Sequence, residues 1–192
     1  MPVIVLGPRN KAPEGIQVVM TVSKSNGWMK GLSPFVLGPV DLYDGYRSKN
    51  VENAWQYSKV YPKYADENGP TEAYFEWANM GWSSTRAFRY PMGKGAKPLY
   101  SFWDGEKLGY VAARKKIYAP LYARCVEQTE AYKTLKELYE KNGVICLWDY
   151  DAYLHRDLGM SYKDVVNCET RKMGHAFVLA MMLENERAWE LK

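Results

Sequence analysis

The segment at residues 51–61, VENAWQYSKVY, constrains the fold most, because as a helix it must be buried along one side. Four small or apolar residues share one stripe of that helix: Val51, Ala54, Trp55 and Ser58. The adjacent stripe carries a carboxylate, an amide and an ammonium on Glu52, Gln56 and Lys59. Because the two stripes touch, the polar one is expected at the edge of the core, where a pocket wall would lie.

Local signals also support a helix that begins near residue 51. Asn50 can cap the first free amide groups, and Glu52 in the first turn is favoured by the positive end of the helix dipole. An ordinary solvated helix face has the same spacing of Glu, Gln and Lys. The spacing alone therefore leaves both a pocket wall and a solvated face open.

Length and pattern predict a helix-rich α+β single domain with a small β-sheet. The 192 residues suffice for one hydrophobic core, and no Pro/Ser-rich linker divides residues 1–192. Short strands are expected at residues 3–6, 16–22, 35–37 and 144–148. Helices are expected at residues 51–61, 71–80, from about 107 with a kink near Pro120, 129–141 and 169–188.

The sequence also indicates a location and excludes some classes of site. No apolar run reaches about 18 residues and the N-terminal apolar segment is too short for a signal peptide, so a cytoplasmic protein with no membrane partner is expected. The widely spaced Cys125, Cys146 and Cys168 predict neither a disulfide framework nor a zinc site. His155 and His175 have no partner at metal-ligand or triad spacing, so core or solvent-facing roles are expected for both.

Positive charge and aromatic side chains gather in residues 84–116. Eight basic residues face two acids there, which gives this segment a charge of +6 within a chain of net charge +4. Six aromatic residues are interleaved with the basic ones. Such a mixture is typical of a surface that binds phosphates and bases, and Arg114 and Lys115 are candidate binding residues. The alternative is an ordinary basic face exposed to solvent.

The strand expected at residues 144–148 delivers two carboxylates directly past its end. Asp149 and Asp151 follow Trp148, and catalytic carboxylates are often held by the end of a rigid element. An ordinary exit from a strand, with Asp as turn former, has the same sequence. Both interpretations stay open at this point.

Residues 28–185 resemble the NADAR (YbiA-like) family. Members carry a Glu-His-x-x-Gln-x-x-Lys motif on a helix, which Glu52, Gln56 and Lys59 match in type and spacing. The other family motifs correspond to residues 33–35, 44–45, 151–155, 171–174 and 181–182. The chain departs from the family pattern at Pro34, at Asn53, at Leu154-His155 in place of Trp-Gly, and at Arg171.

The resemblance implies an N-glycosidase, a hydrolase that cleaves an N-ribosyl bond in an ADP-ribosyl or ribosylamino nucleotide, including ADP-ribosylated guanine in nucleic acid. Breaking that bond builds positive charge on the ribose, which a carboxylate stabilises. Glu52 is then the first catalytic carboxylate, with Asp151, or Asp149 in reserve, as the second. Gln56 and Lys59 would hold ribose, water or phosphate, and Trp55 or Trp148 would stack the base. No cofactor or metal is expected.

Two other classes of function remain open from the sequence. A non-catalytic module would bind ADP-ribose, a nucleotide or nucleic acid through residues 84–116, and replacing Arg114, Lys115 and Lys116 would then weaken binding in a salt-dependent way. A structural or partner-binding protein is the third class, because a likeness of fold does not fix function.

Overall fold

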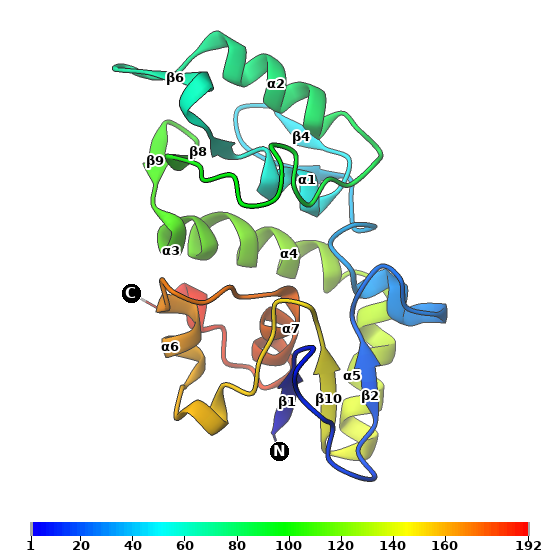
Figure 1. The fold of residues 1–192 in the computed structure, drawn as a ribbon. Helices are drawn as coiled ribbons and strands as arrows, with labels where there is room; N and C mark the ends of the chain where they lie inside the picture. Colours follow the sequence, from blue (N-terminus) through cyan, green and yellow to red (C-terminus); the bar gives the residue numbers. More distant parts are fainter. Residues whose placement is uncertain (1, 192) are drawn as a thin grey trace.

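Three short parallel strands form the main sheet of the computed structural model, which describes residues 2–191 (Figure 1). Strands β1 (Val3–Leu6) and β2 (Val18–Met20) lie on either side of β10 (Ile145–Trp148), and each runs parallel to it. The first two strands therefore join one sheet without pairing with each other. Since β10 is central, its apolar sequence is buried between neighbours on both sides.

Helices pack around this sheet and complete the part that we call the sheet lobe: β1, β2, β10, α5 (Glu130–Asn142), α6 (Tyr162–Asn167) and α7 (His175–Leu183). Helix α7 is buried along its whole length and contacts β1 and β10. Short 3-10 turns connect the elements or follow them at Gly27–Leu32, Pro62–Tyr64, Arg156–Leu158 and Ala188–Glu190. Within residues 2–191, no helix is long and apolar enough to cross a membrane.

A second group of elements, residues 40–108, forms what we call the aromatic lobe. Its helices are α1 (Val51–Gln56) and α2 (Glu72–Trp82). Its strands pair antiparallel: β3 (Val40–Asp41) with β4 (Arg47–Ser48), β6 (Ala65–Asp66) with β7 (Gly69–Pro70), and β8 (Tyr100–Trp103) with β5 (Lys59–Val60) and β9 (Glu106–Leu108). Large rings fill its own core: Tyr57, Tyr61, Tyr74, Trp77 and Trp82.

One long helix lies between the two lobes (Figure 1). It comprises α3 (Tyr110–Ala113), a π-helical turn at Arg114–Tyr118 and α4 (Ala119–Val126). Pro120 has no N–H to donate to the carbonyl of Lys116, so the regular ladder is interrupted just before it. The irregularity expected near Pro120 is therefore present as a π turn. The predicted start of this helix near residue 107 is wrong, because Lys107 pairs in β9.

The segment at residues 51–61 is a helix only as far as Gln56, and Lys59 begins β5. The Ser58 hydroxyl donates to the Trp55 carbonyl at 2.7 Å, and the Ser58 carbonyl accepts from Phe102 N–H at 2.8 Å. Pairing with β8 thus overrides helical propensity. Helix α1 starts where it was predicted to start, because the Asn50 side chain accepts a hydrogen bond from Asn53 N–H at 2.8 Å.

Among the other predictions, the α+β class, the strand at residues 144–148 and the helices at 71–80 and 129–141 are confirmed. Residues 35–37 form a turn instead of a strand, with Val36 and Leu37 both donating to the Ser33 carbonyl. The closing helix is shorter than expected, since α7 starts only after Gly174. Helix α6, begun by a capping box at Ser161, was not anticipated.

Candidate functional site

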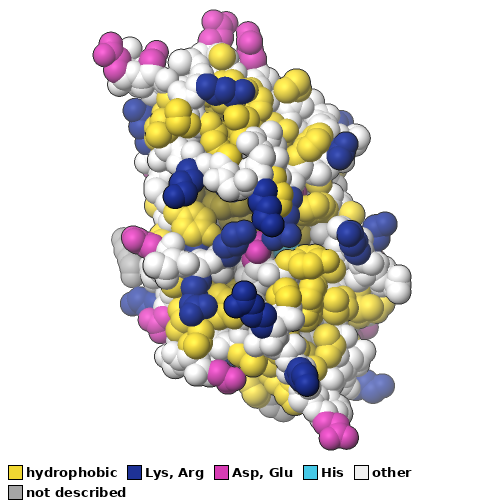
Figure 2. All heavy atoms as spheres, in the orientation of Figure 1, with side chains coloured by type: hydrophobic (Ala, Val, Ile, Leu, Met, Phe, Trp, Pro, Cys, Tyr) yellow, Lys and Arg dark blue, Asp and Glu magenta, His cyan; other side chains and the backbone are white. Residues whose placement is uncertain are grey.

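A cavity of about 570 Å³ opens between the two lobes. It brings together α1, the end of β10 and the start of α7, and so contains the three predicted carboxylates Glu52, Asp149 and Asp151. Figure 2 shows Lys and Arg side chains gathered at mid-height on this face of the molecule, with an acidic side chain among them. The basic residues that line the cavity are Lys24, Lys59, Arg89, Arg114 and Lys172.

One wall of the cavity carries a continuous hydrogen-bonded chain. Gln56 Nε2 donates to Glu52 Oε1 at 2.9 Å, and Lys59 Nζ donates to Gln56 Oε1 at 2.8 Å. Because an ammonium can only donate, Lys59 holds the Gln56 amide with its NH₂ toward Glu52. Glu52 is 5% and Gln56 8% exposed, so this polar stripe lines a pocket and is not a solvated helix face.

Burial controls the ionisation of this chain. Removal from water raises the pKa of the Glu52 carboxyl, and the bond from Gln56 and the charge of Lys59 oppose that effect. Burial likewise lowers the pKa of the Lys59 ammonium to about 8, opposed by the charge of Glu52. Both groups can therefore exchange protons nearer to neutral pH than their surface counterparts.

Lys59 is expected to titrate apart from the other lysines. After reductive methylation with ¹³C-formaldehyde, one lysine NMR signal, besides the signal of the N-terminal amine, should have its midpoint near pH 8, and Lys59→Arg should remove that lysine signal. The unfolded chain keeps this proton up to about pH 10.5, so Lys59 makes the free energy of unfolding rise with pH between about 8 and 10.5. A titration in which every methylated lysine has an ordinary midpoint would contradict this assignment.

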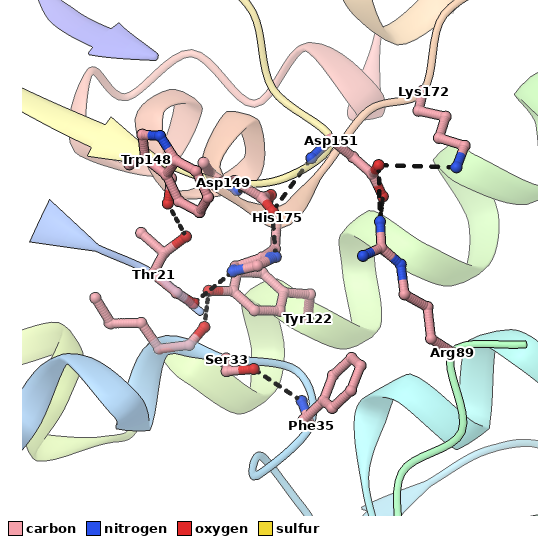
Figure 3. A network of polar contacts seen from close by, with 12 residues as sticks. Thr21, Ser33, Phe35, Arg89, Tyr122, Trp148, Asp149, Asp151, Lys172 and His175 are labelled. Atoms are coloured by element: carbon pink, nitrogen blue, oxygen red, sulfur yellow. Dashed lines mark hydrogen bonds and ion pairs between the residues drawn. The ribbon is translucent and has the colours of Figure 1, made fainter. Parts of the chain in front are cut away.

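Asp149 follows β10 directly, and several polar contacts hold its side chain (Figure 3). His175 Nδ1 lies 3.1 Å from Asp149 Oδ2, which also accepts from Ala176 N–H at 3.3 Å. Asp149 Oδ1 accepts from Asp151 N–H at 3.4 Å. The approach depends on Gly174, because a Cβ there would lie 2.0 Å from Asp149 Oδ2. Asp149 therefore caps the start of α7 from a distant part of the chain.

His175 has a hydrogen-bond acceptor at each ring nitrogen (Figure 3). Its Nε2 lies 2.6 Å from the Thr21 carbonyl oxygen, while Nδ1 faces Asp149. The ring is therefore fixed between the Thr21 carbonyl at the end of β2 and the Asp149 carboxylate at the end of β10. The buried His175 thus has an acidic partner on the cavity wall, contrary to the sequence-based expectation, whereas buried His155 stacks on Tyr162 in the core.

Asp151 lies on the same cavity and is paired with cations (Figure 3). Arg89 Nη2 lies 2.9 Å from both of its carboxylate oxygens, and Lys172 Nζ lies 3.8 Å from Oδ1. The pair links the segment after α2 to the segment after β10, and each of its side chains is about a third exposed. Since Arg89 and Lys172 neutralise Asp151, Glu52 is the better candidate for the chemical step.

The aromatic and basic candidates have different outcomes. Trp55 lines the cavity, with its ring centroid 5.2 Å from that of Tyr118. Trp148 lies outside the lining and packs edge-on against Tyr150, and Lys115 also lies outside the lining. The structure therefore does not bring Trp148 or Lys115 to this site.

Arg114 borders the cavity, but its guanidinium is committed to the fold. The side chain is 2% exposed. It donates to four backbone carbonyls at 2.8 to 3.0 Å, those of Val165, Val166, Cys168 and Arg171. This corrects the expectation of a ligand-binding role, because the donors that a phosphate would need already hold residues 165–171 in place.

Sequence patterns missed the tyrosines around the cavity. Tyr90, Tyr110 and Tyr150 are exposed and line it, and the guanidinium of Arg89 lies 5.3 Å from the Tyr90 ring centre and 5.6 Å from that of Tyr150. Only the aromatic content of residues 84–116 hinted at such a surface. Among residues 2–191, no group of three or more His, Cys, Asp or Glu is placed to hold a metal ion.

A family model described as "Family of unknown function (DUF6939)" matches residues 9–158. The chain belongs to this family. The DUF6939 match includes the carboxylates Glu52, Asp149 and Asp151, whereas Lys172 and His175 follow it. No curated protein and no solved structure matches the chain.

Proposed function

We propose that this protein is an N-glycosyl hydrolase, related to the NADAR (YbiA-like) family, that cleaves an N-ribosyl bond in a nucleotide-type substrate. The observation that carries the proposal is Glu52, a carboxyl only 5% exposed on the wall of an open cavity. Burying a carboxyl is costly, and a costly group oriented by Gln56 and Lys59 in a cavity is typical of a catalytic centre.

The proposed reaction uses both ends of the hydrogen-bonded chain. The bond between ribose C1 and the base nitrogen breaks, and its electron pair leaves with the base. A water oxygen bonds to C1, and its proton passes to Glu52, whose raised pKa makes it a stronger base than a surface carboxylate. The ionised Glu52 also stabilises positive charge on the ribose. Lys59, with a pKa of about 8, can supply a proton to the leaving nitrogen.

The remaining lining suits the other parts of such a substrate. Lys24 and Lys172 provide positive charge for phosphate oxygens, and Trp55 provides a flat face for a base. The finer substrate class that we propose is an ADP-ribosyl or ribosylamino nucleotide, including ADP-ribosylated guanine in nucleic acid. Proposed partners are thus a nucleotide ligand and nucleic acid.

The direct test is incubation of the purified protein with N-ribosyl compounds. The panel contains ADP-ribosylated guanine in DNA, NAD and ribosylamino-pyrimidine phosphates, with released base measured by mass spectrometry. Release of base from at least one compound is expected, with none released by a Glu52→Gln control. If compounds bind but none is cleaved, the hydrolase proposal fails.

A non-catalytic nucleotide or nucleic-acid binding module is the second candidate. It is favoured by the three exposed cavity tyrosines, because rings beside cations can stack bases. The residues to change are Arg89 and Lys172, because both line the cavity, whereas the Arg114 guanidinium bonds backbone carbonyls and Lys116 lies outside the lining. Salt-dependent binding without release of any base would identify this function.

A further inference from the structure

Tyr118 carries a hydroxyl that the fold leaves unused. The residue ends the π-helical turn, is 7% exposed and lines the cavity beside Trp55. No residue from 2 to 191 forms a hydrogen bond with its hydroxyl. By contrast, the hydroxyl of Tyr122, four residues further along, donates to the Leu32 carbonyl at 2.5 Å.

This hydroxyl is open to the cavity. Four unpaired polar groups of the described chain are sealed from solvent: the hydroxyls of Tyr43, Tyr100 and Tyr153 and the indole N–H of Trp82. Tyr118 is not among them, although its ring is buried. An accessible, unpaired donor on a cavity wall is available to a ligand. Its position on a π turn is consistent with such a role, because π turns are frequent at functional sites.

The surroundings of Tyr118 define the kind of ligand group. Burial and the nearby carboxylates of Asp149, Glu52 and Asp151 raise the pKa of Tyr118 well above its ordinary value. The phenol therefore stays neutral and can donate a hydrogen bond. The same carboxylates would repel a phosphate. A sugar hydroxyl fits, because it can accept from Tyr118 and donate to a carboxylate oxygen.

Glu52 offers the matching acceptor. Its Oε1 accepts from Gln56, and no hydrogen bond within residues 2–191 occupies its Oε2. We infer that Tyr118 and Glu52 form a subsite for the 2-hydroxyl of ribose, in which Tyr118 donates a hydrogen bond to the hydroxyl oxygen and Glu52 Oε2 accepts a hydrogen bond from the hydroxyl group. This inference rests on the proposed function for the ribosyl nature of the ligand, and it assigns Tyr118 a direct contact with that ligand.

The subsite is tested by binding alone, with ribose 5-phosphate and 2-deoxyribose 5-phosphate as probes in titration calorimetry of the full chain. The wild type is expected to prefer ribose 5-phosphate. Tyr118→Phe should weaken ribose 5-phosphate binding by roughly fivefold or more, the contribution of one hydrogen bond, and should reduce the preference over 2-deoxyribose 5-phosphate by the same factor. Tyr132→Phe on α5, outside the cavity lining, is the matched control and should bind as the wild type does.

Three results would overturn the subsite: no binding of ribose 5-phosphate to the wild type, equal affinity for both probes, or an unchanged preference in Tyr118→Phe. A lower Tm for Tyr118→Phe would also count against it, because an unpaired hydroxyl should contribute nothing to stability. If the binding pattern is found but no N-ribosyl compound is cleaved, the subsite stands and the hydrolase proposal falls. Cleavage without any effect of Tyr118→Phe removes the subsite alone.

Discussion

Replacing Glu52 with Gln is expected to lower kcat for the proposed N-ribosyl cleavage by on the order of 10³-fold, within the usual range for losing a general base. The amide keeps the shape of the side chain but can neither take a proton from water nor carry negative charge beside the ribose. Substrate affinity should change much less, because Gln56 and Lys59 remain. The measurement is steady-state kinetics on the compound cleaved by the wild type.

Wild-type activity should also fall as the pH drops through the raised pKa of Glu52, at a higher pH than for an ordinary glutamate. In the folded protein this carboxyl keeps its proton to a higher pH than in the unfolded chain. The contribution of Glu52 to the free energy of unfolding therefore decreases as the pH rises from the ordinary pKa of a glutamate to the raised pKa of Glu52. The Glu52→Gln variant should not show this decrease. Urea unfolding of both proteins at several pH values measures the difference.

Glu72→Gln is the matched control, because Glu72 is also in the first turn of a helix but is exposed. It should retain wild-type kcat. A Glu52→Gln variant that folds and keeps more than about a tenth of wild-type kcat would rule out Glu52 as the general base, since even a weak base contributes about 10².

Arg114→Ala is expected to lower the free energy of unfolding by about 3 to 5 kcal/mol. The variant leaves buried carbonyl oxygens without the charged donor that they bind in the wild type. The four carbonyls of residues 165–171 lose their shared partner. Arg114→Lys should recover only part of the loss, because one ammonium cannot reproduce the planar fork of a guanidinium. Equilibrium unfolding in urea measures both variants.

Lys116→Ala is the comparison for this effect. Lys116 lies two residues away and pairs with Glu106 at the surface, where such a pair contributes less than about 1 kcal/mol. An Arg114→Ala variant that unfolds at the same urea concentration as Lys116→Ala would show that Arg114 is free to bind a ligand after all.

Local signals made part of this structure predictable. The helix at residues 129–141 has Thr129 as its cap and ends at Gly143, whose φ of 70° favours glycine. Asn50 caps α1, and the apolar run before Asp149 forms the central strand. These features depend on neighbouring residues and on side-chain periodicity, which a sequence states directly.

The site itself was only half predictable. The sequence indicated Glu52, Gln56 and Lys59 as one polar stripe, and the structure retains their contact although Lys59 lies on a strand. Whether that stripe faces solvent or a cavity depends on what packs over it. The sequence could not decide this, because the covering segments around residues 89 and 172 are distant along the chain.

The amino-acid sequence by itself determined the α+β class, the Asn50 cap of α1 and the carboxylates that follow β10. Only the tertiary structure decided that Arg114 serves the fold, that Asp151 is neutralised by Arg89, and that His175 has partners. Thr21, Asp149 and His175 meet because the ends of two parallel strands and the start of α7 converge at one point. This convergence depends on packing between segments that are far apart in the chain. The energy of that packing cannot be inferred from a local sequence pattern.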